Sequence, residues 1–235
     1  RIYDYSVEGK IVPGWQFGRT DTEVTGKVQH FRVKTKDYIV FADKYQIYIL
    51  NRRGQVRVEP EKQFARSKYN LFTLETGHRN TQPRMVTTDI NGTIHFVYFN
   101  GRIETREIHT YSSEHQFDYE DVDGNGQKDF IFLDENRLEV YESPKQQLFE
   151  YAFQENISGP PIYFHFSNDD RKLGAVSRQE NRIYLINGNG KMMQGFPLNG
   201  NSPFTIGLLG RGNSNFDLIV GDKFNFLYNY HVKNE

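Results

Sequence analysis

The fold is decided by a stretch that occurs twice in the chain. Residues 1–15 read RIYDYSVEGKIVPGW, and residues 182–196 read RIYLINGNGKMMQGF. The two copies share the Arg-Ile-Tyr opening, a Gly-Lys pair at Gly9 and Gly190, and a glycine before the last aromatic residue. A segment that recurs with its glycines in place indicates an internal structural repeat.

Weaker copies of this segment fill the chain between the two. Each copy is marked by one apolar anchor, and successive anchors are 45, 47, 44, 45 and 43 residues apart. The anchors are Ile2, Ile47, Ile94, Leu138, Ile183 and Phe226. A period of about 45 residues fits two classes of repeat, the paired-helix HEAT or armadillo unit and the four-stranded propeller blade.

Composition separates these two classes. The 235 residues include 20 glycines, 15 tyrosines and 19 phenylalanines, but only four alanines. Alanine is the strongest helix former, whereas Tyr, Phe, Ile and Val that alternate with polar residues favour strands. The pattern therefore predicts an all-β chain, a β-propeller of four-stranded blades that forms a single domain over residues 1–235.

The phase of the repeat leaves two forms of the ring open. In the first full unit, we expect strands near residues 27–33, 37–42, 46–51 and 55–58. The chain starts in a third-strand segment, passes through whole units and stops after another third-strand segment, which amounts to about five blades. Either the two ends pair and close a five-bladed ring, or the chain is part of a larger propeller. An arginine at position 1 favours the larger propeller.

Charge and composition exclude several classes of function. Lysine and arginine number 29 against 30 acidic residues, so no global positive field exists and nucleic acid is not an expected partner. The absence of cysteine excludes disulfides, thiolate zinc sites and cysteine nucleophiles. No apolar run reaches the roughly 18 residues of a membrane-spanning helix, so we expect no membrane span. No nucleophile elbow, phosphate-binding loop or HExxH motif occurs, so no catalytic or cofactor-binding residue is predicted.

One loop carries a ligand pattern for a hard cation. Residues 121–129 read DVDGNGQKD, with side-chain oxygens at positions 1, 3, 5 and 9 and a backbone carbonyl at position 7. Oxygen ligands in a glycine-containing loop suit Ca²⁺ better than a transition metal. An EF-hand would need glutamate at position 12, where Phe132 stands in an apolar run that predicts a strand. The alternative is an Asx-rich turn that needs no ion.

An Asp-rich nonapeptide that leads into a strand resembles the FG-GAP or VCBS repeat of integrin-α-like β-propellers. The resemblance implies that the loop joins the first and second strands of a blade and binds calcium. It also implies the ligands, which would be Asp121, Asp123, Asn125, Asp129 and the carbonyl of Gln127. The repeated Gly-Lys segments are similar to those of quinoprotein-type propellers as well.

These features predict a non-enzymatic binding or scaffold module of an exported bacterial protein, located in the periplasm, at the cell surface or outside the cell. Its partner would be a protein or a glycan on a propeller face, where loops of every blade meet. The calcium ion would be structural, because the loop fills its own coordination sphere. The alternative is a polysaccharide-active or quinone-dependent enzyme with its site in the central channel.

Overall fold

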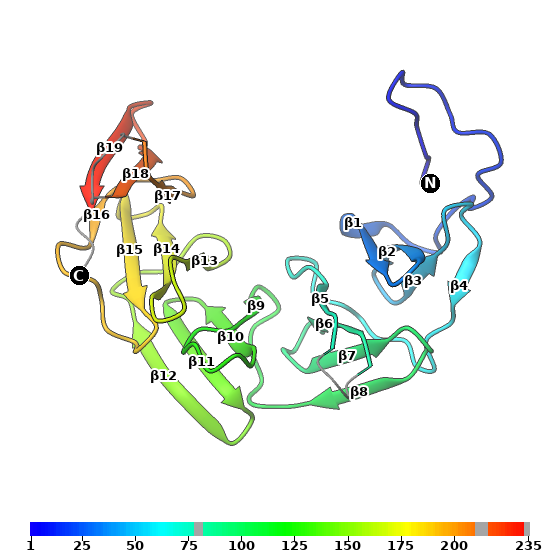
Figure 1. Cartoon of the computed structure of the whole chain (residues 1–235), viewed down its shortest axis with the longest axis horizontal. Coiled ribbons are helices and arrows are strands. Elements are labelled where there is room, and N and C mark those ends of the chain that lie inside the picture. Colours follow the sequence, from blue (N-terminus) through cyan, green and yellow to red (C-terminus); the bar gives the residue numbers. More distant parts are fainter. Residues whose placement is uncertain (78–81, 210–215, 233–235) are drawn as a thin grey trace. The chain divides into compact units, whose positions relative to one another are not determined.

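The computed structural model describes residues 1–77, 82–209 and 216–232, and within these ranges the regular structure is all strand. The strands form five antiparallel sheets, and in every sheet the strands follow one another in chain order (Figure 1). Four of these sheets have four strands and the last has three. The described residues contain no helix that could cross a membrane. The all-β prediction is therefore confirmed, and the succession of sheets is propeller-like.

The chain divides into two compact units, Arg1–Glu114 and His115–Glu235. The single domain over residues 1–235 stays a prediction. The first unit holds two sheets. They consist of β1 (Val24–Val33), β2 (Lys36–Asp43), β3 (Ile47–Leu50) and β4 (Val56–Val58), then β5 (Thr73–Glu75), β6 (Arg84–Thr88), β7 (Ile94–Tyr98) and β8 (Ile103–Arg106). Strands β1 to β4 confirm the four expected strands to within three residues at each end. The anchor Ile2 precedes them and lies in no strand.

The second unit holds three sheets. The first consists of β9 (Gln116–Glu120), β10 (Asp129–Asp134), β11 (Arg137–Ser143) and β12 (Gln146–Ala152). The next consists of β13 (Ile162–His165), β14 (Arg171–Ser177), β15 (Arg182–Asn187) and β16 (Leu198–Asn199). The last consists of β17 (Thr205–Gly207), β18 (Phe216–Gly221) and β19 (Leu227–Val232).

Four of the six predicted anchors are buried at the start of a third strand, namely Ile47, Ile94, Leu138 and Ile183. Phe226 differs, because it precedes β19 and is exposed. The reason is its place in the hairpin. Gly221 pairs with Leu227 as Thr88 pairs with Ile94, so both turns have five residues and Phe226 corresponds to Thr93, the last residue of the turn. The predicted anchor therefore falls one residue before the strand.

An aspartate at the end of the second strand stabilises several of these hairpins. The Oδ1 atom of Asp43 accepts hydrogen bonds from the backbone N–H groups of Tyr45 and Gln46, and its Oδ2 accepts one from the Tyr48 hydroxyl. Burial alone would raise the pKa of Asp43, but these hydrogen bonds hold that pKa below its usual value. Two further hairpins repeat the arrangement with the pairs Asp89–His95 and Asp222–Tyr228.

The sheet formed by β13 to β16 is buried on both of its faces. Alternate side chains of β15 enter two different clusters, because successive residues of a strand point to opposite faces. Tyr184 and Ile186 pack with residues of β10 and β11, whereas Ile183 and Leu185 pack with residues of β18 and β19. In the first unit, one cluster likewise joins β2 and β3 to β6 and β7. Within each unit, neighbouring sheets are thus held together by shared clusters.

We expect the substitution Leu185→Ala to lower the free energy of unfolding by about 2–5 kcal/mol, because it removes a fully buried side chain between two sheets. Leu227→Ala is the control, since that side chain is 74% exposed and its removal should change the same quantity by less than about 0.5 kcal/mol. Chemical denaturation of both variants measures the difference. Equal losses would contradict the packing described for β15.

Candidate metal centre

The Asp-rich loop joins the first and second strands of its sheet, as the resemblance implies. It leaves β9 after Glu120 and enters β10 at Asp129, and these two residues face each other across the two strands. The left-handed backbone of the loop at Gly124 and Gly126, with φ of 85° and 84°, turns the chain back on itself. The loop therefore brings its beginning and its end together.

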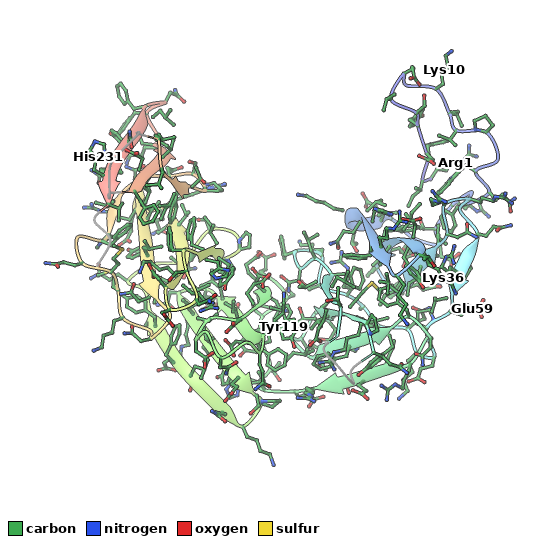
Figure 2. All side chains as sticks on the ribbon, viewed as in Figure 1. Arg1, Lys10, Lys36, Glu59, Tyr119 and His231 are labelled. Atoms are coloured by element: carbon green, nitrogen blue, oxygen red, sulfur yellow. The ribbon has the colours of Figure 1, made fainter. Side chains whose placement is uncertain are left out.

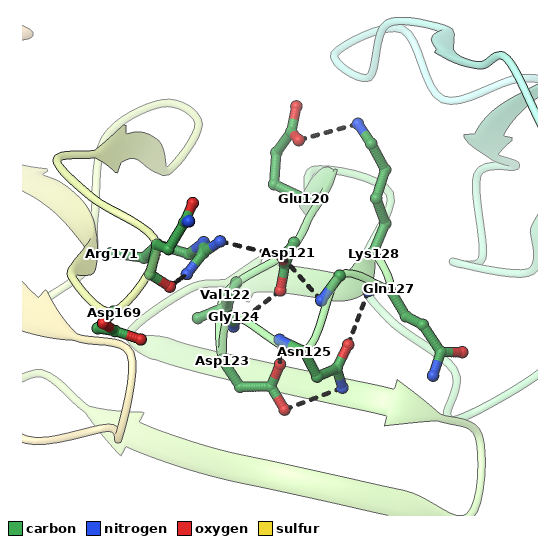
Figure 3. Close-up of polar contacts among 12 residues, drawn as sticks. Glu120, Asp121, Val122, Asp123, Gly124, Asn125, Gln127, Lys128, Asp169 and Arg171 are labelled. Atoms are coloured by element: carbon green, nitrogen blue, oxygen red, sulfur yellow. Dashed lines mark hydrogen bonds and ion pairs between the residues drawn. The ribbon is translucent and has the colours of Figure 1, made fainter. Parts of the chain in front are cut away.

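Three carboxylates meet inside this loop. Asp121, Asp123 and Asp129 each offer an oxygen, and these oxygens lie within 4.8 Å of one another. Figure 3 shows Asp121 and Asp123 in the loop. Asp121 is fixed by the backbone, because its Oδ1 accepts a hydrogen bond from the N–H of Gly124 at 2.8 Å and its Oδ2 accepts one from the N–H of Gly126 at 3.1 Å. The cluster is thus preformed by the fold of the loop.

Asp129 is the buried member of the cluster. Its Oδ2 accepts a hydrogen bond from the N–H of Val122 at 2.7 Å, but its buried Oδ1 has no hydrogen-bond partner among the described residues. Burial, together with the carboxylates of Asp123 and Asp121, raises the pKa of Asp129 to about 7. A buried carboxylate oxygen without a partner is costly, and a cation at the cluster would offset that cost.

The other two predicted ligands lie at the edge of the cluster. The side-chain nitrogen of Asn125 faces carboxylates, with Nδ2 3.1 Å from Oδ2 of Asp123 and 3.0 Å from Oε1 of Glu142. Its Oδ1 accepts a hydrogen bond from the N–H of Gln127 at 2.7 Å, so this oxygen is not directed at the three carboxylates. The Gln127 side chain points away from the loop (Figure 3).

Two residues that the sequence does not single out reach the loop from the neighbouring sheet. Arg171 opens β14 and is buried, and its Nη2 lies 3.2 Å from Oδ2 of Asp121 (Figure 3). It also donates a hydrogen bond to the carbonyl oxygen of Asn168. The hydroxyl of Tyr163, from β13, donates a hydrogen bond to the carbonyl oxygen of Asp121 at 2.7 Å. With all groups ionised, the three aspartates and Arg171 carry a net charge of −2, which suits a divalent cation.

Glycines allow the loop to approach this neighbouring sheet closely. A Cβ atom on Gly124 would lie 2.4 Å from Nη1 of Arg171 and 2.8 Å from the carbonyl oxygen of Asn168. A Cβ atom on Gly188, after β15, would lie 2.4 Å from the carbonyl oxygen of Val122. Larger residues at either position would push the loop and the sheet apart.

A polar pocket of about 480 Å³ adjoins the loop. Asp123 and Val122 form its wall on the loop side, and residues of the next sheet form the rest. Lys172 is buried there, and its Nζ donates hydrogen bonds to Oδ1 of Asp170 at 2.6 Å and to Oδ1 of Asn187 at 2.9 Å. The pocket therefore presents fixed charges and amides.

The last sheet uses a different partner at the corresponding point. Asp217 in β18 aligns with Asp129, and its Oδ2 accepts a hydrogen bond from the N–H of Leu209 at 3.1 Å. Its Oδ1 lies 2.8 Å from Nδ1 of His231 in β19. In the last sheet, His231 thus contacts Oδ1 of Asp217, whereas the corresponding Oδ1 of Asp129 has no hydrogen-bond partner among the described residues.

Comparison with known proteins adds evidence on the fold. No family model and no curated protein matches the chain. Among solved structures, the chain is similar to BBS1N in complex with ARL6DN in a mercury-soaked crystal (TM-score 0.57) and in a lead-soaked crystal (TM-score 0.53). Both matches have 12% identity and cover 99% of this chain and 72% of that chain. A protein of unknown function from Bacteroides caccae matches with a TM-score of 0.46 and 10% identity, over 97% of this chain and 87% of that chain. At 12% identity, the likeness to BBS1N shows a common propeller-like fold.

We expect Gly124→Ala to destabilise the protein more than Gly126→Ala. Both positions have a left-handed backbone, which costs an alanine about 1–2 kcal/mol. Only the Cβ at position 124 would also meet the neighbouring sheet, which adds about 1–3 kcal/mol, since nothing lies within 4 Å of the Cβ at position 126. Urea denaturation in the presence of a chelator measures both losses. Equal losses would show that the loop does not press against Arg171 and Asn168.

Proposed function

We propose that the chain is a β-propeller module that binds a protein partner, and that residues 121–129 hold a structural calcium ion. In this proposal each sheet is one blade of the propeller, and the chain supplies about five blades. The succession of antiparallel sheets, the packing of neighbouring sheets within each unit and the likeness to BBS1N support the blade assignment. The ion and the partner each rest on a separate observation.

The buried oxygen of Asp129 carries the proposal of an ion. Calcium binds oxygen at about 2.3–2.6 Å, so ligand atoms on opposite sides of one ion are about 5 Å apart. The oxygens of Asp121, Asp123 and Asp129 lie within 4.8 Å of one another and so fit around one such ion. A calcium ion would give Oδ1 of Asp129 the partner that it lacks among the described residues. All three donors are hard oxygens, which favour calcium over zinc or copper.

The remaining ligands would come from the same loop and from water. The backbone carbonyl of Gln127 is one candidate. The side chain of Asn125 is another, provided that its amide group rotates and Oδ1 takes the position that Nδ2 now has beside Asp123. A loop with few charged ligands binds calcium weakly, at the millimolar levels found outside cells. This affinity is the reason that we place the protein in an exported compartment, in the periplasm or at the cell surface.

The role that we assign to the ion is to hold two sheets together. Asp121 binds the loop backbone and also contacts Arg171 of β14, and its carbonyl accepts the hydrogen bond from Tyr163. An ion that fixes Asp121 against Asp123 and Asp129 would therefore fix the loop, the start of β10 and the neighbouring sheet. This role is structural, because the ligands surround the ion on several sides.

The proposed partner is a protein that docks where the loop and the adjoining pocket lie. Loops at one end of a propeller are the usual docking surface of this fold. BBS1N, which is similar in fold, was crystallised in complex with ARL6, and this supports a protein as the class of partner. The pocket beside the loop offers Asp169 and Asn189 as polar contacts.

We expect calcium to stabilise the wild-type protein and to have no effect on the Asp129→Asn variant. A ligand at 100 times its dissociation constant adds about 2.7 kcal/mol to the free energy of unfolding. Asparagine keeps the shape of Asp129 and its acceptor for the Val122 N–H, so the variant should fold without calcium. Melting temperature across a calcium titration to millimolar levels measures the effect.

Asp169→Asn is the matched control, because Asp169 lies beside the loop but outside the carboxylate cluster. This variant should respond to calcium as the wild type does. Magnesium should replace calcium poorly, since it demands six ligands in a strict octahedron. An unchanged melting temperature of the wild type with millimolar calcium would refute the ion and leave the Asx-rich turn as the explanation of the motif.

We expect a protein partner captured with the immobilised chain to be lost by the Asp169→Arg variant, because this change places a bulky positive charge at the pocket. The control is Glu150→Arg, which makes the same change of charge on the exposed part of the outer strand β12. Binding is compared by surface plasmon resonance of the identified partner. Loss of binding in the control alone would place the docking surface on the outer strands.

A further inference from the structure

Residues 1–15 have the backbone structure of residues 182–196. Every backbone hydrogen bond within the second segment's turn recurs in the first, at a constant offset of 181 residues. In the first segment, backbone N–H groups donate to carbonyls in the pairs Ser6–Lys10, Gly9–Ser6, Val12–Asp4 and Trp15–Val12. In the second segment, the corresponding pairs are Asn187–Lys191, Gly190–Asn187, Met193–Leu185 and Phe196–Met193. The isolated bridge between Tyr5 and Ile11 likewise matches the one between Ile186 and Met192. Residues 1–15 therefore correspond to the third strand β15 and the turn that follows it.

The two copies differ in what lies beside them. In the second copy, β15 pairs along its length with β14, and the pairs include Tyr184 with Ala175 and Ile186 with Leu173. In the first copy, residues 1–4 pair with no strand among the described residues, and Tyr5 has only its bridge to Ile11. One edge of this segment is thus open (Figure 1).

The apolar side chains on this segment are uncovered for the same reason. Tyr3 and Tyr5 are 50% and 55% exposed, whereas their counterparts Tyr184 and Ile186 are 5% and 0% exposed. Ile11 is also exposed. Figure 2 shows Arg1 and Lys10 of this segment away from Lys36, which opens β2 in the same unit. The sequence of the segment is that of a buried strand, but its surroundings leave it at the surface.

A pocket of about 560 Å³ lies beside residues 1–3. It is lined by Ile2, Tyr3, Ile11, Trp15 and Phe17, among others, and is mostly apolar. The side toward β2 and β3 is already closed, because the Phe17 ring packs edge-on against the rings of Phe41 and Tyr48 at 5.4 and 5.5 Å. Ile2 and Tyr3, which pair with no strand among the described residues, form part of its wall.

We propose that the edge formed by residues 1–5 binds a β-hairpin that is equivalent to β13 and β14. The second strand of the hairpin runs antiparallel to residues 1–5, as β14 runs beside β15. This addition of strands would cover Tyr3 and Tyr5 and fill the apolar pocket. The inference rests on the blade assignment of the proposed function but does not depend on the calcium ion.

The repeat also specifies the side chains of this hairpin. In the second copy, Val176 lies opposite Ile183, Ala175 opposite Tyr184 and Leu173 opposite Ile186. The same offset places a branched aliphatic residue opposite Ile2, a small residue opposite Tyr3 and a larger aliphatic residue opposite Tyr5. The occupant is thus a hairpin of this repeat class.

The test is a chimera in which a copy of residues 162–181 is fused in front of Arg1. Because Asn181 directly precedes Arg182, the graft keeps the repeat in phase. We expect the backbone amide hydrogens of residues 2–5 to exchange with solvent at least about tenfold more slowly than in the wild-type chain, because these residues become part of a sheet. Trp15 is the sole tryptophan and lines the pocket, so its fluorescence should shift to the blue and its quenching by acrylamide should fall.

The matched control carries the same graft with glutamate at the two grafted positions that correspond to Leu173 and Ala175. This graft places charges against Tyr5 and Tyr3 and should leave the exchange rates of residues 2–5 as in the wild type. Amides that exchange at the wild-type rate in a folded chimera would overturn the proposal. Retained calcium stabilisation in that chimera would show that the proposed ion site survives the failure.

A second arm keeps the proposal testable if the chimera does not fold. A synthetic peptide of residues 162–177, added to the wild-type chain, should shift the Trp15 fluorescence, and the peptide with the two glutamates should not. No shift with either peptide, together with a chimera that does not fold, would also overturn the proposal. A fluorescence shift that depends on the concentration of the wild-type chain alone would identify a second copy as the occupant and would exclude the hairpin.

Discussion

The architecture depends on one constraint, namely that the apolar faces of the sheets must be covered by neighbouring sheets. Strand β15 shows it most clearly, because alternate side chains enter separate clusters with the preceding and the following sheet. A sheet of this kind cannot be stable alone, so the unit repeats. The same constraint explains why the segment of residues 1–15 stands out, since it has the apolar residues of an inner strand without the neighbour that covers them.

Much of the fold could be predicted from the sequence because strand alternation and hairpin turns are local properties. The anchors Ile47, Ile94, Leu138 and Ile183 are buried at the expected places, at the start of a third strand. Phe226 is not, because it is the last residue of its turn, and the pairing of Gly221 with Leu227 that ends this turn is not visible in the spacing of the repeat. The division of the chain into two compact units has no signal in the repeat, which runs through both.

The candidate site divides in the same way. The convergence of Asp121, Asp123 and Asp129 follows from spacing within nine residues, so the sequence predicts it. Arg171 and Tyr163 come from the next sheet, and no local pattern connects them with the loop. The lack of a partner for Oδ1 of Asp129 also depends on tertiary burial. These contacts turn a sequence motif into a site that links two sheets.

The aspartates that end β2, β6 and β18 have a consequence for how the chain folds. Each one bonds to groups that follow it within six residues, so closing these hairpins brings together only neighbouring parts of the chain and costs little loop entropy. Hairpins of this size form in microseconds, well before distant sheets can meet. Assembly can thus proceed by the docking of hairpins that are already closed, and the local pairing within each sheet favours faster folding than pairing between distant strands would.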